Sequence, residues 1–430
     1  MVYFLGTKFV EKGDVQDKTM TKKLSMFFAL LIALLAASAP IAASAAALQL
    51  YSETAILIDG DTGQVLFEQN MHRQMHPASI TKVMTALVAL EHGDMDDVIT
   101  MSYDAVFSIG RRTSHIALVP DEELTLANAM YANALSSAND ASNGIAEHIG
   151  GTKEAFAAMM NQRAREAGAL NTNFTNAHGL HEAGHLTTAY DMARIMMEAI
   201  RIPRFTEMFS TQQHDIPPTN RQAQVRHLWT TNTMVSGRYA FEGFVAGKTG
   251  YTTPAGHTLV TAARRDGRTL IAVVMRSESR RESRVDTEQL LNHGFDAFTQ
   301  ISFAPEELEQ ADFPLGGETA ALFSDSGIRL LIPNDYTQED VEIRYVYEHG
   351  AVRAVFTLNE TVLGELEMQT DLISPEHSSL NDPSIENPEE SRSTWWIWLI
   401  GIVGALLLGW GLLEAGYQVL KWRRRSRHAT

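Results

Sequence analysis

The chain contains no cysteine among its 430 residues. This absence excludes disulfide bonds, a cysteine nucleophile and any zinc site with cysteine ligands. Lysine is also scarce, since residues 46–394 contain only Lys82, Lys153 and Lys248 against 22 arginines. Arginine does not release its proton near neutral pH, so a site that needs a neutral amine has to keep lysine. The few lysines are therefore candidates for chemistry.

Positive charge is in deficit over most of the chain. Residues 46–394 carry 25 Lys and Arg against 48 Asp and Glu, which gives a formal net charge of −23. Such a surface disfavours binding to nucleic acid and offers no polybasic patch for an anionic membrane. The composition is typical of an acidic, exported enzyme.

Long hydrophobic runs occur only near the two ends. Lys22 and Lys23 precede the apolar run 24–37, and small residues at 43–45 suit a signal peptidase, so residues 1–45 are predicted to be an export signal. Met20 stands where such a signal normally begins, which leaves open an over-long start assignment. A retained membrane helix is the alternative.

The second long run, residues 395–413, has no charged residue and begins with three tryptophans within four positions. A basic tail, 414–430, follows it. Length, interfacial tryptophans and the positive-inside rule predict one transmembrane helix with the preceding chain outside and the tail in the cytoplasm. A helix lying on the membrane surface is the alternative.

The segment His76-Pro-Ala-Ser-Ile-Thr-Lys82 opens an apolar run that extends to Leu90. We expect a buried helix that begins near Ser79. Three residues make nearly one helical turn, so the Ser79 hydroxyl and the Lys82 amine point to the same side. This pair suits a nucleophile and its base. An N-cap serine followed by a surface lysine is the alternative.

Two further motifs follow in order. Ser137-Ala138-Asn139 comes after a helical pattern over 124–135, and Lys248-Thr249-Gly250 stands at the mouth of a predicted strand. The ordered set Ser-x-x-Lys, Ser-x-Asn, Lys-Thr-Gly resembles that of the low-molecular-mass penicillin-binding proteins, specifically the serine D-alanyl-D-alanine carboxypeptidases. Stretches 55–67, 176–193 and 248–256 are also similar to this family. The resemblance covers residues 50–300 strongly and 301–370 weakly.

The resemblance implies roles for the first two motifs. Ser79 would attack the carbonyl between two terminal D-alanines, and Lys82 would take its proton, with a pKa lowered partly by Lys248. Ser137 would act as the third catalytic residue, relaying a proton. Asn139 would hold Lys82 and the substrate amide.

The third motif would bind the substrate. Lys248 and Thr249 would hold the substrate carboxylate, while Gly250 would let its strand lie close against the peptide. The backbone N–H groups of Ser79 and Tyr251 would form the oxyanion hole.

The implied function is removal of the terminal D-alanine from peptidoglycan stem peptides, with β-lactams as inhibitors that acylate the same serine. We expect a single-pass protein of the cell membrane with its catalytic domain on the extracytoplasmic side. A D,D-endopeptidase acting on cross-linked peptidoglycan would use the same residues. A β-lactamase and a non-catalytic wall-binding scaffold are further alternatives.

The predicted organisation is an α/β (α+β) catalytic domain over 48–300, a small β-rich domain over 301–370 and a disordered linker over 371–394. The catalytic domain has predicted strand hairpins at 55–67 and 258–275 and a closing helix over 285–298. Strands at both ends with helices between them indicate an antiparallel sheet flanked by helices.

Three histidines, His178, His181 and His185, are spaced as metal ligands can be, but they fall in a loop-like stretch with two glycines. We expect no metal and no cofactor, and interpret His178 as ordering the loop beneath the active site.

Three charged residues have two possible interpretations each. Glu166 faintly resembles the deacylation base of class A β-lactamases, but a surface charge is preferred because its spacing to Leu170-Asn171 is one residue too long. Arg221 and Arg226 are candidates for binding the substrate carboxylate, although ordinary surface arginines fit equally well.

Overall fold

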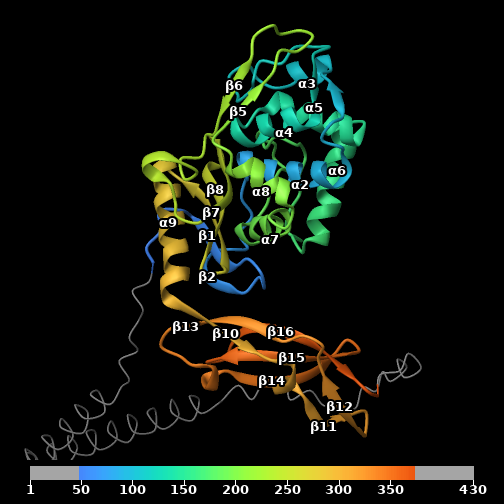
Figure 1. Cartoon of the computed structure of the whole chain (residues 1–430), viewed down its shortest axis with the longest axis vertical. Coiled ribbons are helices and arrows are strands. Elements are labelled where there is room, and N and C mark those ends of the chain that lie inside the picture. The colour runs from blue at the N-terminus through green and yellow to red at the C-terminus, as the bar shows by residue number, and fades with distance from the viewer. Residues whose placement is uncertain (1–47, 373–430) are drawn as a thin grey trace, which may run out of the picture. The chain divides into compact units, whose positions relative to one another are not determined.

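The computed structural model describes residues 48–372 and divides into two compact units. The first unit runs up to Ile301 and also includes Arg329–Asp340, whereas the second comprises Ser302–Ile328 and the chain from Val341 onwards (Figure 1). The predicted export signal, nearly all of the predicted linker, the predicted transmembrane helix 395–413 and the basic tail lie outside the described residues. No helix within 48–372 is long and apolar enough to cross a membrane.

The first unit is built on a five-stranded antiparallel sheet in the order β2-β1-β9-β8-β7. Its strands are β1 (Thr54–Asp59), β2 (Val65–Gln69), β7 (Phe244–Thr252), β8 (Gly256–Arg265) and β9 (Arg268–Ser277). Both predicted hairpins are present, and β1 pairs with β9 so that Ile56 lies opposite Val273. The two ends of the unit therefore meet in one sheet, and β7 is left at its edge.

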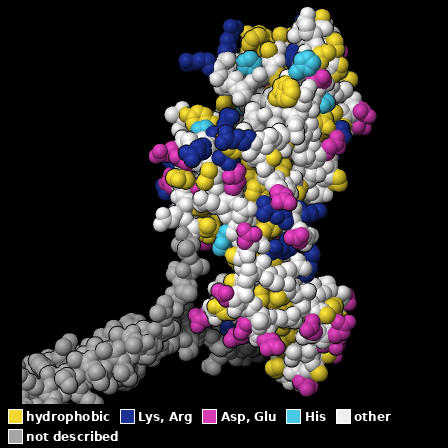
Figure 2. Space-filling view, turned by 60° about the vertical axis from the view of Figure 1, so that its left-hand side comes forward, with side chains coloured by type: hydrophobic (Ala, Val, Ile, Leu, Met, Phe, Trp, Pro, Cys, Tyr) yellow, Lys and Arg dark blue, Asp and Glu magenta, His cyan; other side chains and the backbone are white. Residues whose placement is uncertain are grey.

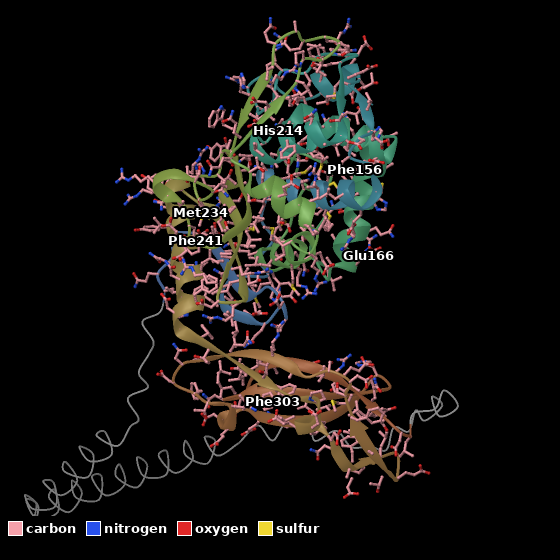
Figure 3. All side chains as sticks on the ribbon, in the orientation of Figure 1. Phe156, Glu166, His214, Met234, Phe241 and Phe303 are labelled. Carbon is pink, nitrogen blue, oxygen red and sulfur yellow. The ribbon has the colours of Figure 1, made fainter. Side chains whose placement is uncertain are left out.

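Apolar side chains cover both faces of this sheet. Along β1, Ile56 and Ile58 join the core cluster shared with the helices that follow the first motif, whereas Ala55 and Leu57 join the cluster beneath the closing helix. This is the alternation of a strand whose two faces are both buried. Figure 3 labels Phe156 in the first cluster and both Met234 and Phe241 in the second. The mixed α/β class is thus as predicted.

Helices form the rest of the first unit. The closing helix α9 (Arg280–Ala297) begins five residues earlier than predicted, because Ser279 and Glu282 form a capping box at its start. The remaining elements are η1 (Ala78–Thr81), α2 (Lys82–His92), β3 (Val98–Thr100), α3 (Tyr103–Phe107), β4 (Glu123–Thr125), α4 (Leu126–Leu135), α5 (Asn139–Gly150), α6 (Lys153–Glu166), α7 (Ala189–Ala199), α8 (Pro203–Ser210), β5 (Gln213–Ile216), β6 (Arg226–Trp229) and η2 (Gly237–Tyr239).

The second unit is rich in strands, as predicted. Its five-stranded sheet has the order β11-β12-β16-β15-β14, and rings of Phe303 and Phe356 pack in its core with centroids 5.1 Å apart. The elements are η3 (Pro305–Leu308), β11 (Gln310–Leu315), β12 (Glu318–Phe323), β14 (Glu342–Glu348), β15 (Ala351–Leu358) and β16 (Thr361–Thr370). Its described residues carry 12 Asp and Glu against two Arg, and Figure 2 shows acidic side chains scattered over the visible face of this unit.

Two strands and one short turn connect these parts of the chain. They are β10 (Phe298–Phe303), β13 (Ile328–Pro333) and η4 (Gln338–Asp340), and β10 pairs with β13. Residues 329–340 belong to the first unit. Within this unit, the Gln64 side chain donates to the Leu331 carbonyl at 2.6 Å and accepts from the Leu331 N–H at 2.8 Å.

Candidate active site

Ser79 lies in the 3₁₀ turn η1 and not at the start of the α-helix, which begins at Lys82. The helical segment therefore begins near Ser79 as expected, but its first turn is a 3₁₀ turn and the α-helix itself begins at Lys82. The preceding residue Ala78 has φ +50°, a left-handed conformation that costs free energy for any residue with a Cβ atom. Residues i and i+3 eclipse in a 3₁₀ turn, so the Ser79 and Lys82 side chains still face each other.

The Lys82 amine is buried and its polar contacts are specific. Its Nζ atom lies 3.3 Å from Ser79 Oγ, 2.7 Å from Asn139 Oδ1 and 2.6 Å from the carbonyl oxygen of His178. A neutral amine has two N–H groups and one lone pair. If the two N–H groups donate to Asn139 and His178, the lone pair remains for the Ser79 hydroxyl.

Burial lowers the pKa of Lys82 well below its ordinary value, and the charge of Lys248 lowers it further, while Asp140 opposes the shift. The lowered pKa favours the neutral amine, which is the form that can accept a proton. The geometry and the electrostatics together make Lys82 a suitable base for Ser79.

The second motif lies between α4 and α5. Ser137 has φ +54°, and its buried Oγ atom has no hydrogen-bond partner within the described part of the chain. A buried hydroxyl without a partner is uncommon in folded proteins. Asp140, which the sequence analysis did not single out, accepts from the N–H groups of Ile116 and Leu118 and so fixes the loop beside this motif.

The third motif lies on the edge strand β7. Lys248 is buried, its Nζ donates to the Thr249 carbonyl at 2.9 Å, and Thr249 Oγ1 lies 3.2 Å from Thr231 Oγ1. Burial, and then the charge of Arg280, lowers the pKa of Lys248 to about 7. Lys248 therefore changes charge near neutral pH. Tyr251 is exposed and lies on the same strand.

Gly250 brings β7 against the nucleophile turn. A Cβ atom at this position would lie 2.4 Å from Thr258 Oγ1, 2.8 Å from Ser79 N and 3.1 Å from Ile80 N. The family resemblance implied that glycine is needed here because the substrate peptide lies close to the strand. The structure adds a second reason, which is the contact between the strand and the turn itself.

The loop 176–185 contacts the first motif through its backbone. Its His178 carbonyl binds Lys82, and its Ala177 carbonyl accepts from Thr85 Oγ1 at 2.6 Å. Gly179, with φ +83°, approaches so closely that a Cβ atom would lie 1.9 Å from Ala78 O. The loop thus orders the motif through its backbone. Residues 48–372 contain no group of three or more His, Cys, Asp or Glu side chains placed to hold a metal ion.

The other charged candidates are engaged elsewhere. Arg226 forms a bidentate ion pair with the buried Glu122, at 2.7 and 2.9 Å, and Arg221 pairs with Asp121 at 3.1 Å. Their proposed contact with a substrate carboxylate is therefore not favoured. Glu166 lies on the exposed side of α6 (Figure 3), which agrees with the surface interpretation.

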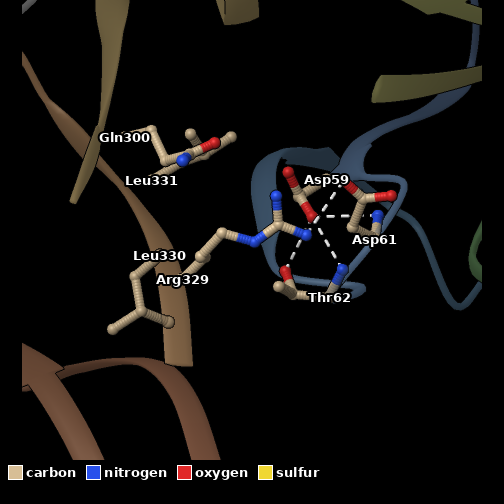
Figure 4. A pocket seen from close by; sticks show the side chains of 7 residues that line it. All are labelled: Asp59, Asp61, Thr62, Gln300, Arg329, Leu330 and Leu331. Atoms are coloured by element: carbon tan, nitrogen blue, oxygen red, sulfur yellow. Dashed lines mark hydrogen bonds and ion pairs between the residues drawn. The ribbon is translucent and has the colours of Figure 1, made fainter. Parts of the chain in front are cut away.

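Two surface hollows contain none of the motif residues. Figure 4 shows the smaller, where Asp59 Oδ1 accepts from Thr62 N at 2.7 Å and from Asp61 N at 3.0 Å, and Arg329 lies 3.6 Å from Asp61. These bonds fix the turn between β1 and β2. The larger, of about 290 Å³, lies by β3, β4 and the end of β5. Neither presents a nucleophile with a base.

Comparison with known proteins agrees with this geometry. The chain matches the family model described as D-alanyl-D-alanine carboxypeptidase (peptidase S11) over residues 40–279. It is 34% identical over 252 residues to the D-alanyl-D-alanine carboxypeptidase DacF of Bacillus subtilis, covering 57% of this chain and 63% of the relative. It is 29% identical to the carboxypeptidase DacA of Escherichia coli, covering 75% of this chain and 80% of the relative. The chain thus spans just under two thirds of the first of these relatives.

Solved structures show the same fold. Penicillin-binding protein 5 from Haemophilus influenzae aligns with a TM-score of 0.64 and 26% identity over 75% of this chain and 97% of that one. A D-alanyl-D-alanine carboxypeptidase from Mycobacterium tuberculosis aligns with a TM-score of 0.53 and 28% identity over 59% of this chain and 94% of that one. The match of the family model to more than half of the chain confirms the resemblance stated from the motifs. The chain belongs to the D-alanyl-D-alanine carboxypeptidase family of serine peptidases.

Proposed function

We propose that this protein is a serine-type D-Ala-D-Ala carboxypeptidase that removes the terminal D-alanine from peptidoglycan stem peptides. The observation that carries the proposal is the buried Lys82 amine, 3.3 Å from Ser79 Oγ and held by Asn139 and His178. A lysine with this environment has no evident structural purpose, because an unpaired buried cation is costly. It does have a purpose as a base.

The first chemical step is attack of Ser79 Oγ on the carbonyl carbon of the penultimate D-alanine. Lys82 accepts the hydroxyl proton, and the negative charge that develops on the carbonyl oxygen is stabilised by the N–H groups of Ser79 and Tyr251. Gly250 allows those two backbone segments to lie together. The terminal D-alanine leaves with a proton relayed through Ser137, and an ester to Ser79 remains.

Water then hydrolyses the ester, with Lys82 again as the base. Lys248 and Thr249 hold the terminal carboxylate of the substrate during the first step. A β-lactam carries a comparable carboxylate and an acylating carbonyl, so it would enter the same site and acylate Ser79. The reaction needs no cofactor.

The test is incubation of the purified full-length protein with a peptide ending in D-Ala-D-Ala, with Ser79→Ala as the matched control. We expect release of free D-alanine that the variant loses. A fluorescent penicillin provides a second readout through covalent labelling of Ser79. Cleavage of cross-linked peptides in place of D-alanine release would favour the endopeptidase. If neither D-alanine release nor labelling is observed, the wall-binding scaffold becomes the favoured interpretation.

We further propose that the protein is exported and held in the cell membrane by one helix, with the catalytic unit outside. Support comes from the sequence features of residues 1–45 and 395–430, which lie outside the described residues. Truncation before residue 395 is expected to move the protein from the membrane fraction to the soluble extracytoplasmic fraction. Retention in the membrane fraction would contradict the anchor.

A further inference from the structure

His185 lies buried at the end of the loop 176–185, and both of its ring nitrogens have partners. Nδ1 lies 3.0 Å from the backbone nitrogen of Thr175, and Nε2 lies 2.8 Å from Thr81 Oγ1. Because a backbone N–H can only donate, Nδ1 accepts, and the proton of the neutral ring belongs on Nε2. Burial, and then the charges of His76 and Lys82, lowers the pKa of His185 to about 3, so the ring is neutral at physiological pH.

The Nε2–H group orders the turn that carries the nucleophile. It donates to Thr81 Oγ1, and the hydroxyl of Thr81 in turn donates to the Ala78 carbonyl at 2.8 Å. Ala78 is the residue with the left-handed backbone directly before Ser79. Such a conformation persists only where its surroundings hold it. The two linked hydrogen bonds from His185 are part of that support.

His185 also contacts His76, which precedes Ser79 in the sequence, whereas Thr81 follows it. Its backbone carbonyl lies 3.0 Å from Nδ1 of His76, which can donate to it. The nucleophile therefore lies between two positions, 76 and 81, that both bind one buried residue. Neither bond involves Ser79 Oγ, Lys82 Nζ or the third motif.

We propose that His185 is a positioning residue that holds the Ala78–Thr81 turn so that Ser79 Oγ stays opposite Lys82 Nζ. The inference rests on the proposed acyl transfer from substrate to Ser79. Loosening the turn would slow acylation, because reacting groups misplaced by about 1 Å can lose about 100-fold in rate. Substrate binding should change little, since Lys248 and Thr249 lie on β7 and do not depend on these bonds.

The experiment compares three variants of the full-length protein: His185→Phe, His185→Gln and Thr81→Val. The rate of acylation by a fluorescent penicillin is measured together with kcat and KM for D-alanine release. We expect His185→Phe and Thr81→Val each to lower the acylation rate about 10- to 100-fold with KM close to that of the wild type. Glutamine can place an N–H donor near the position of Nε2, so His185→Gln should recover much of the rate.

The double variant Thr81→Val/His185→Phe gives the sharpest result. Both changes break the same pair of linked hydrogen bonds, so the double variant should be no slower than the worse single one. Thr187→Val is the matched control. It removes a buried hydroxyl two residues from His185 that bonds to Thr172 and not to the turn. This control should lose thermal stability and keep its acylation rate.

Three results would overturn the inference: wild-type acylation by a folded His185→Phe, an equal loss in Thr187→Val, or losses that multiply in the double variant. If His185→Phe does not fold, the acylation rates of Thr81→Val and His185→Gln still test whether these hydrogen bonds position Ser79. A wild-type protein that is neither labelled nor active would instead refute the proposed function, so the two failures are distinguishable.

Discussion

Substituting Gly250 by alanine is expected to disable the enzyme by separating β7 from the nucleophile turn. The new Cβ atom would lie 2.8 Å from Ser79 N, whereas ordinary contacts begin at 3.4 Å, so one backbone segment must move by about 0.6 Å. The contact with Thr258 Oγ1 at 2.4 Å would also displace the hydroxyl that donates to Pro77 O at 2.9 Å. Overpacking of this kind costs about 1–3 kcal/mol of stability.

The larger effect should be on rate. A shift that approaches 1 Å between reacting groups costs up to about 100-fold, so we expect acylation by a fluorescent penicillin to fall about 10- to 100-fold in Gly250→Ala. A stopped-flow labelling assay measures this rate, and a thermal melt shows that the variant is folded. Gly184→Ala is the control, because the nearest atoms to its Cβ would lie at 3.8 Å.

The choice of a small β-lactam separates two explanations. If Gly250 were needed only for the approach of a long peptide, KM for the peptide would rise while acylation by the β-lactam stayed unchanged. Wild-type acylation by folded Gly250→Ala would therefore refute the contact between strand and turn as a requirement for catalysis.

Three other predictions follow from the electrostatics. Lys248 titrates at about 7, so kcat/KM should fall as pH rises through that value and the carboxylate-binding charge is lost. Arg280→Gln should raise the pKa of Lys248 and so move the alkaline limb of the kcat/KM profile to higher pH. An unchanged alkaline limb would contradict the assignment of this titration to Lys248. Asn139→Asp would place an anion 2.7 Å from the buried base, raise its pKa and lower kcat at neutral pH, with partial recovery at higher pH in the rate profile. Arg226→Met should leave Glu122 buried and unpaired and cost about 3–5 kcal/mol in a denaturant titration. A large loss of kcat without that loss of stability would restore the substrate-binding interpretation of this arginine.

Several features were readable from local sequence. The strand hairpins follow from alternating apolar residues around short turns, and β1 and the β8–β9 hairpin formed as expected. The start of α9 was predicted five residues too late, although Ser279 and Glu282 have the spacing of a capping box that marks the observed start. The order of the three motifs, which contain two of the three lysines of residues 46–394, was sufficient to indicate the family.

The tertiary structure decided how these residues can react. The family resemblance implied that Asn139 holds Lys82, as the structure has it, but no local pattern shows that the other partner is the carbonyl of His178, 96 positions away. The pairing of Arg226 with Glu122 spans 104 positions and was equally unreadable. Sequence determined which residue types are available and the elements that carry them. A pKa depends on burial and on neighbouring charges, and a strained backbone such as that of Ala78 depends on the packing that holds it, so both exist only once distant segments have come together.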